Sequence, residues 1–496
     1  MNMKSKTQSF SPPLARANWL QEWIPITLIL LLAVTLYFYQ LGTESLWIDE
    51  LYSIHDAKAI PEKLRLTRPL YFILLRLWMF FGESDVWLRG LSIPFGLGSV
   101  FLTYCLGRRL VGQRVGLIAA LLVTLSPVFI NHAQEVRMYS LSTFLGLVGT
   151  LALTHGLERM TTVSISCWLI ARLLATLTTP LNCLLLLPDC LLLVWKFRKR
   201  YRVLLGVGAV LLVVGIVSLP WIFQVATASS AFFDGWTANN PKPTLVNVLS
   251  RLTIFTAYWP LKSLQSSVSE HFYKLYTIML AGLLGFSLFN RQLKPHIFWL
   301  AAWGFLPTAV LFIMSWIFSP VWLPRYLLFI APYLLILLAV GFSKIWHRAR
   351  KLGIAIALMY FVAVGGGLEH YYTKVYRHDW RSVSQMITIN EQPEDVIALH
   401  IGYPRPRLAL NHYYQGSAPI QVLDLEEWEQ SLSPFPSRLW LVHNNNRNPD
   451  STEQLQNELR KRFQIQNHQV FKNEIGYKSY IDVFLVTPKD TETALD

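Results

Sequence analysis

Long apolar runs alternate with short polar connections along most of the chain. Eleven of these runs approach the ~20 residues that a helix needs to cross the hydrocarbon core of a bilayer. The pattern therefore predicts about eleven membrane spans, at Ile24–Leu41, Leu88–Gly107, Val115–Ile130, Val136–Gly156, Val163–Thr178, Leu181–Trp195, Val203–Val225, Phe272–Phe289, His296–Phe318, Arg325–Phe342 and Gly353–Leu368.

The apolar segment Pro69–Gly82 is too short for a span, and its length suits a helix that lies in the membrane interface. The basic residues support this interpretation. If the segment does not cross, every basic cluster falls on the side of the N-terminus, which the positive-inside rule makes the cytoplasm. These clusters are Lys4, Lys6 and Arg16; Arg108, Arg109 and Arg114; Lys196 to Arg202; Arg291 and Lys294; and Lys344 to Lys351.

The C-terminal region changes abruptly to a polar composition. It alternates helical patterns at Trp380–Asn390 and Thr452–Phe463 with strand-like runs at Asp395–Ile401, Pro419–Leu425, Ser437–His443 and Tyr480–Val486. We therefore expect two domains: a transmembrane domain over residues 1–368 and a small α/β domain over residues 369–496. The span count places the second domain outside the cytoplasm.

Composition agrees with an α-helical polytopic membrane protein. Of the 496 residues, 53% are hydrophobic and 15% are charged, which is too apolar for a water-soluble protein of this length. The net charge of +14 comes from clusters between apolar runs, so it indicates topology and not nucleic-acid binding. The four cysteines lie in or beside apolar runs and indicate neither a disulfide framework nor a zinc site. We expect a bacterial-type plasma membrane protein with a cytoplasmic N-terminus.

Two adjacent carboxylates, Asp49 and Glu50, follow the first span and face the outside in this topology. They form either a hydrated loop or an acidic site. An enzyme on this face has no ready access to nucleotide-activated donors, so group transfer there would use a donor carried by the lipid, typically on a prenyl phosphate. Such a reaction needs a carboxylate base and cations for the phosphate. Ionisable residues also gather at Gln134 to Tyr139, where the next predicted span begins.

Several motifs occur in a fixed order: Ser-Leu-Trp-Ile-Asp-Glu-Leu-Tyr-Ser (45–53), Arg-Pro-Leu-Tyr-Phe-Ile-Leu-Leu (68–75), Leu-Gly-Arg-Arg-Leu-Val-Gly (106–112), Ser-Pro-Val (126–128) followed by Gln-Glu-Val-Arg-Met-Tyr (134–139), Pro-Arg-Tyr-Leu-Leu (324–328) and Asp-Trp-Arg (379–381). In this order the chain resembles the GT-C glycosyltransferases, in the branch of the protein mannosyltransferases and aminoarabinose transferases (glycosyltransferase family 39-like). The resemblance runs from about Gly42 to Leu368 and reaches Asp-Trp-Arg.

The resemblance implies transfer of a sugar from a polyprenyl-phosphate donor to an extracytoplasmic acceptor, with inversion at the anomeric carbon. The acceptor is a glycan, a lipid or a protein. Asp49 matches the family's first-loop aspartate, which acts on the acceptor hydroxyl, and Glu50 matches its neighbour. The candidates for donor or substrate binding are Arg68, Glu135, Arg137, Tyr139 and Arg325. Each has a simpler alternative, such as an ion pair between Glu135 and Arg137 or lipid contact by Arg68 and Arg325.

One position departs from the family pattern. Relatives carry His-Pro-Pro, or an acidic residue with Lys-Pro, where this chain has Thr67, Arg68 and Pro69. A threonine cannot act as a strong base or acid, so the resemblance assigns no such role to this position. Some GT-C enzymes use a divalent ion, and Asp49 with Glu50 is compatible with Mg²⁺ or Mn²⁺ without requiring either.

Two other classes of protein stay open at this level. A lipid or glycan transporter or flippase would explain the spans, but such proteins usually have related halves and polar sites at the membrane midplane. A receptor-like protein would use the C-terminal domain for partner binding and would leave the acidic first loop unexplained.

The topology predicts how a cysteine introduced at Ser84 will react. In a variant whose four native cysteines are replaced, Ser84→Cys is expected to react with a membrane-impermeant maleimide in intact cells, because an interfacial Pro69–Gly82 leaves Ser84 outside. Labelling only after permeabilisation would contradict this topology.

Overall fold

The computed structural model describes residues 19–489, with gaps at 63–67, 159–160, 202–204, 207, 210, 218, 220–241, 258–266, 290–293, 318–321, 376, 401–405, 424–435, 446–448 and 473–479. The chain divides into two compact units. The first contains Met1–Tyr39, Leu64–Trp78 and Arg89–His370. The second contains Tyr371–Asp496 together with Gln40–Lys63 and Met79–Leu88, so it includes the acidic first loop.

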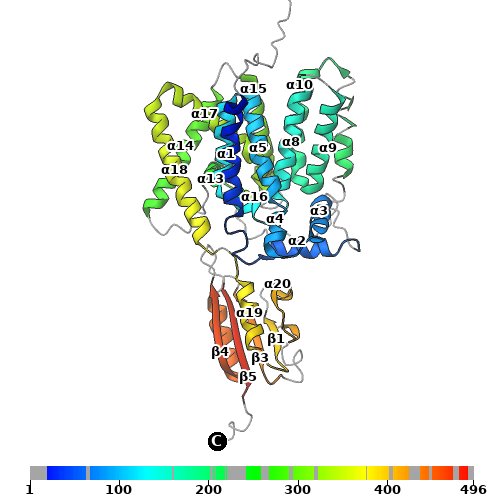
Figure 1. The fold of residues 1–496 in the computed structure, drawn as a ribbon, viewed down its shortest axis with the longest axis vertical. Helices are drawn as coiled ribbons and strands as arrows, with labels where there is room; N and C mark the ends of the chain where they lie inside the picture. The colour runs from blue at the N-terminus through cyan, green and yellow to red at the C-terminus, as the bar shows by residue number, and fades with distance from the viewer. Residues whose placement is uncertain are drawn as a thin grey trace, which may run out of the picture. The chain divides into compact units, whose positions relative to one another are not determined.

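The first unit is helical (Figure 1). Helices form along the apolar runs because a helix pairs its backbone N–H and C=O groups with each other. Hydrocarbon offers these groups no hydrogen-bond partners. The described helices of this unit, with α4 at its boundary, are α1 (Trp19–Phe38), α3 (Pro69–Met79), α4 (Asp85–Gly90), α5 (Ile93–Leu110), α6 (Gln113–Leu125), α7 (Pro127–Ala133), α8 (Tyr139–Gly156), α9 (Thr162–Thr178), η1 (Pro180–Leu185), α10 (Leu186–Phe197), α13 (Leu245–Ala257), α14 (Ser267–Leu288), α15 (Lys294–Ile317), α16 (Pro324–Leu327), η3 (Leu328–Ile330), α17 (Ala331–Arg348) and α18 (Arg350–Thr373).

Helices occupy ten of the eleven predicted spans, and in the eleventh, Val203–Val225, the described residues, which lie between positions 205 and 219, are helical as well. Within the described part, five helices are long and apolar enough to cross a membrane, or six if the bent pair α6 and α7 is one span. That pair bends by 65° between Leu125 and Pro127, because proline begins a new helix and keeps the preceding Ser126 extended. The number of crossings and the interfacial place of α3 stay predictions.

The Leu-Gly-Arg-Arg-Leu-Val-Gly motif turns the chain from α5 into α6. Gly112 adopts φ +147°, a backbone conformation that other residues rarely adopt. A Cβ atom added to Gly107 would lie 2.9 Å from the Cα of Gly116, so the two helices pack backbone against backbone. Small residues at such positions let helices approach closely.

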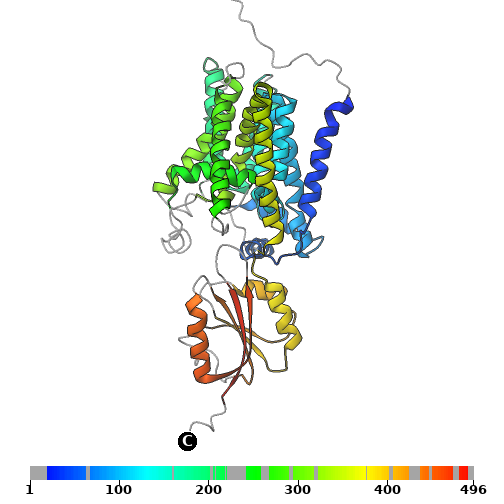
Figure 2. The same cartoon turned by 90° about the vertical axis from the view of Figure 1, so that its left-hand side faces the viewer.

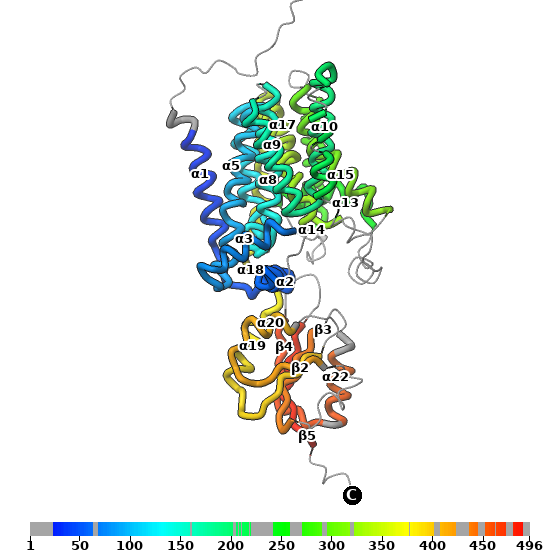
Figure 3. Tube along the Cα trace, turned by 90° about the vertical axis from the view of Figure 1, so that its right-hand side faces the viewer, coloured from blue at the N-terminus to red at the C-terminus, as the bar shows by residue number. Residues whose placement is uncertain are grey.

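The second unit is built on a five-stranded sheet of order β2-β1-β3-β5-β4. β1, β2 and β3 are parallel, and β5 pairs antiparallel with both β3 and β4. Figure 2 and Figure 3 show α22 on one face of the sheet and α19 and α20 on the other. The elements are α2 (Ile48–Lys58), α19 (Trp380–Asn390), β1 (Val396–His400), α20 (Pro406–Tyr413), β2 (Ile420–Leu423), β3 (Leu439–Asn445), α22 (Pro449–Arg462), β4 (Phe463–Lys472) and β5 (Tyr480–Pro488).

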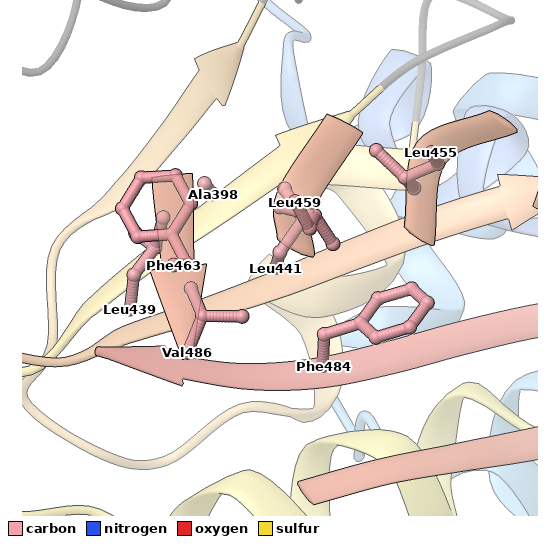
Figure 4. Packing of buried hydrophobic residues seen from close by; sticks show 8 residues of the cluster. All are labelled: Ala398, Leu439, Leu441, Leu455, Leu459, Phe463, Phe484 and Val486. Atoms are coloured by element: carbon pink, nitrogen blue, oxygen red, sulfur yellow. The ribbon is translucent and has the colours of Figure 1, made fainter. Parts of the chain in front are cut away.

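The core of this sheet lies under α22. Figure 4 shows Leu455 and Leu459 of the helix against inward side chains of the strands, among them Leu441 and Phe484. The four predicted strands and two predicted helices are present, and β4 and α20 are additional. Strand β4 was not predicted because it is a largely exposed edge strand, and its register shifts between Ile465 and Asn467.

A buried ion pair inside the helical unit joins Arg172 of α9 to Asp189 of α10. Both side chains are almost completely buried. The guanidinium donates to the Asp189 carboxylate at 2.7 and 3.2 Å and to Thr150 Oγ1 at 2.7 Å. The indoles of Trp168 and Trp303 each donate to the same carboxylate at 2.7 Å. The network ties α8, α9, α10 and α15 together with its charges matched.

We predict that Asp189→Ala destabilises the chain by about 3–5 kcal/mol, because it leaves a buried guanidinium uncompensated. The double variant Arg172→Met with Asp189→Leu is expected to recover most of that loss, since replacing a buried ion pair by apolar side chains is often neutral. Thermal unfolding in detergent measures both, with Cys190→Ala on the same helix as control. A single variant as stable as this control would contradict the assignment.

Candidate functional site

The acidic pair lies in the first turn of α2. Helix α2 begins after Trp47. The backbone N–H of Trp47 donates to Glu50 Oε2 at 3.1 Å, so Glu50 takes the place of the N3 carboxylate in a capping box. Asp49 and Glu50 therefore sit at the helix N-terminus, where the helix dipole favours negative charge. Asp49 is half-buried, whereas Glu50 is fully buried.

The environment of Glu50 separates it from Asp49. Arg377 Nη1 lies 3.1 Å from Glu50 Oε2, and Arg377 Nε lies 3.6 Å from Glu44 Oε2. The Glu50 carboxylate is thus engaged by a backbone N–H and a guanidinium. Its geometry is that of a support for the first turn of α2, and the role of proton acceptor fits Asp49 better.

The Asp-Trp-Arg motif holds the first loop within the second unit. Asp379 accepts from Ser382 N at 3.1 Å, which caps α19, and from Ser45 Oγ at 3.1 Å. Arg381 donates to the carbonyl of Gly42 at 3.1 Å and to Asp85 Oδ2 at 2.6 Å. The motif therefore binds residues on both sides of α2.

Asp85 receives two further contacts from α20. Tyr413 Oη donates to it at 2.7 Å, and His412 Nε2 lies 3.2 Å from it. The Tyr413 hydroxyl in turn accepts from the backbone N–H of Leu46 at 2.7 Å. Side chains from α19 and α20 thus hold the loop on which Asp49 is carried.

Three of the predicted arginines influence one another electrostatically in the first unit. Burial lowers the pKa of Arg68, and Arg137 and Arg325 lower it further. Tyr139 and Tyr326 act in the opposite direction but do not outweigh them. Arg137 also lies over the ring of Tyr139 at 5.7 Å. Like charges brought together away from water are costly, so this cluster is suited to an anion.

The second loop is held by its own hydrogen bonds. Gln134 Nε2 donates to the carbonyls of Tyr37 at 3.0 Å and Tyr39 at 2.8 Å, at the C-terminal end of α1. Glu135 Oε1 accepts from Asn131 at 2.7 Å, and its Oε2 lies 2.8 Å from His132 Nδ1. Gln134 caps the end of α1, while Glu135, a predicted site residue, fixes the turn that precedes Arg137.

One arginine was missed by the sequence analysis. Arg251 of α13 donates to the carbonyl of Trp322 at 3.0 Å and lies 5.7 Å from the centre of its indole ring. Within the described part of the chain, the Nε of Arg251 and the Nε1 of Trp322 are buried without a hydrogen-bond partner. Trp322 precedes the Pro-Arg-Tyr motif of Arg325. The available signal was a single charged residue in a helix that carries no other charge.

Two expectations are not addressed by the geometry. Thr67 lies outside the described residues. Among the residues that are described, no group of three or more His, Cys, Asp or Glu side chains is arranged to hold a metal ion. A divalent cation at Asp49 and Glu50 would have to compete with Arg377.

Comparison by sequence gives little. No known family profile matches the chain. An uncharacterized protein of Aquifex aeolicus (strain VF5) is 30% identical over 122 residues, which cover 22% of this chain and 24% of that protein. The chain thus matches about a quarter of the length of that relative, too little to assign a family.

Comparison by structure covers most of the chain. ArnT from Cupriavidus metallidurans bound to undecaprenyl phosphate is similar with a TM-score of 0.57 and 14% identity, over 93% of this chain and 98% of ArnT. The archaeal oligosaccharyltransferase AglB from Archaeoglobus fulgidus, in complex with an inhibitory peptide and a dolichol-phosphate, is similar with a TM-score of 0.51 and 12% identity, over 86% of this chain and 70% of AglB. The chain therefore has the GT-C fold of these two membrane glycosyltransferases, as its motifs predict.

Proposed function

We propose that the chain is a membrane glycosyltransferase that moves a sugar from a polyprenyl-phosphate donor to an acceptor on the extracytoplasmic face. The observation that carries this proposal is that Arg68, Arg137 and Arg325 lie close enough for Arg137 and Arg325 to lower the pKa of the buried Arg68, and three guanidinium groups in one region suit a phosphate. The shared fold supports it, since ArnT binds undecaprenyl phosphate and AglB binds a dolichol-phosphate in those structures. The chain would act in a bacterial-type plasma membrane, with a cytoplasmic N-terminus.

The proposed reaction is a single displacement at the anomeric carbon. The acceptor oxygen forms a bond to C1 and passes its proton to Asp49, while the bond between C1 and the phosphate oxygen breaks. The electron pair leaves with the prenyl phosphate, and the guanidinium groups stabilise the charge that develops there. Attack opposite the leaving group inverts the anomeric centre. The proposal leaves the acceptor as a glycan, a lipid or a protein.

Three further residues, Arg251, Trp322 and Tyr139, would help to bind the donor phosphate. Arg251 contacts Trp322, which precedes the Pro-Arg-Tyr motif of Arg325, and within the described residues both side chains carry a buried donor without a hydrogen-bond partner, so we include them among the residues for the donor phosphate. Tyr139 would line the same cluster through its contact with Arg137. The buried Arg172–Asp189 pair is bonded to its neighbours in the bundle and so does not itself favour the alternative, a transporter.

Asp49→Asn is expected to lower kcat by about 10²–10⁴-fold, because an amide cannot accept the proton. Transfer is measured in membranes supplied with lipid-linked sugar donors, with protein abundance checked by immunoblot. Glu62→Gln, an exposed carboxylate of the same loop, serves as control and is expected to keep full activity. Full activity of Asp49→Asn would remove Asp49 from the mechanism.

Arg325→Gln is expected to raise the KM for the donor by about 10–100-fold, the loss of one hydrogen bond to a charged group. Arg325→Lys should retain part of the affinity, since it keeps the charge but not the fork of donors. Arg251→Gln should weaken donor binding in the same way. Arg350→Gln, which removes an exposed guanidinium at the start of α18, serves as the control and is expected to leave the donor KM unchanged. An unchanged donor KM in Arg325→Gln would refute the phosphate site.

A further inference from the structure

Arg377 links the acidic turn of α2 to the connection between α18 and α19. Its guanidinium lies 3.1 Å from the fully buried carboxylate of Glu50, and its side chain is only 10% exposed. A buried carboxylate needs a matched charge, so this contact restricts where the first turn of α2 can lie. Asp49 is the preceding residue in that turn.

We propose that Arg377 is a positioning residue for Asp49 and acts on it through Glu50. The inference rests on the proposed function, because it takes Asp49 as the base. Glu50 is fixed twice, by the backbone N–H of Trp47 and by Arg377, and these two bonds meet at the same oxygen. With Glu50 held, the backbone of the helix turn leaves Asp49 little freedom to move relative to it.

The neighbouring Arg381 provides a contrast within the same connection. It binds the carbonyl of Gly42 and the carboxylate of Asp85, which lie before and after α2 in the chain. Arg381 therefore holds the loop, whereas Arg377 contacts the turn that carries Asp49. If the connection only holds the loop, replacing either arginine should lower kcat by a similar factor. If Arg377 positions Asp49, replacing Arg377 should lower kcat more than replacing Arg381.

The role of Glu44 fits this distinction. Arg377 Nε lies 3.6 Å from Glu44 Oε2, so the guanidinium spans two carboxylates on either side of Trp47. A guanidinium presents several donors in a rigid plane, which one ammonium group does not. Arg377→Lys is therefore expected to restore the pairing with Glu50 only in part.

The test compares Arg377→Gln with Arg381→Gln in the full chain, purified in detergent and supplied with a polyprenyl-phosphate sugar. Arg377→Gln is expected to lower kcat on the order of 100-fold, the effect of a small displacement of a catalytic group, with the donor KM within about twofold of wild type. Arg377→Lys should recover at least about tenfold of the loss. Arg381→Gln should lower kcat by less than about tenfold.

Two further measurements separate a positioning role from a structural one. In a cycle with Glu50→Gln, the double variant should be no slower than Arg377→Gln alone, since both act through one contact. Amide hydrogen exchange, followed by mass spectrometry, should accelerate over residues 48–53 in Arg377→Gln and stay within about twofold of wild type in Arg381→Gln.

The outcomes are distinguishable from failure of the proposed function. Equal losses of kcat in the two arginine variants, or additive losses with Glu50→Gln, would overturn the positioning role while Asp49→Asn still tests the base. If Asp49→Asn is fully active, the proposed function fails, and unchanged exchange over residues 48–53 in Arg377→Gln would then overturn the contact itself.

Discussion

Exclusion of water from the helical unit is the constraint on which the remaining features depend. Hydrocarbon leaves backbone groups no partners except each other, so the apolar runs become helices. It also makes an unmatched charge expensive, and the chain meets that cost with Arg172 and Asp189, whose hydrogen bonds join four helices. The same unit also brings three cations, Arg68, Arg137 and Arg325, close enough to influence one another electrostatically.

The second unit shows a different use of buried charge. Its ion pairs and hydrogen bonds connect the first loop to segments more than three hundred residues later in the chain, through Arg377, Asp379, Arg381 and Tyr413. The loop that carries Asp49 thereby shares one compact unit with the C-terminal sheet. Under the proposed function, the C-terminal region contributes to catalysis by fixing the loop, whatever acceptor the enzyme uses.

Local patterns predicted most of the elements. The bounds of α19 agree with the predicted Trp380–Asn390, and the described residues of every predicted span are largely helical, because apolar length and periodicity are properties of adjacent residues. Edge strand β4 was missed because it is largely exposed and its register shifts, so apolar and polar residues do not alternate regularly along it. Helix α20 was missed because its 8 residues are too few to show a clear helical period of apolar positions.

The site was predictable only as far as its motifs reach. They brought Asp49, Arg137 and Arg325 into view as separate candidates, since each lies in a recognisable run. They could not assign Glu50 its partner, because Arg377 comes close to it only in the folded chain. Arg251 was missed for the same reason, as its contact with Trp322 joins α13 to a residue 71 positions later in the chain.

The most direct test of the central claim maps where a prenyl phosphate binds. A polyprenyl phosphate with a photoreactive group next to the phosphate is crosslinked to the purified chain, and the labelled peptides are identified by mass spectrometry. The account predicts labels on peptides that contain Arg68, Arg137 or Arg325, and their loss when unlabelled undecaprenyl phosphate is in excess. Labels confined to α9, α10 or the C-terminal sheet would contradict it.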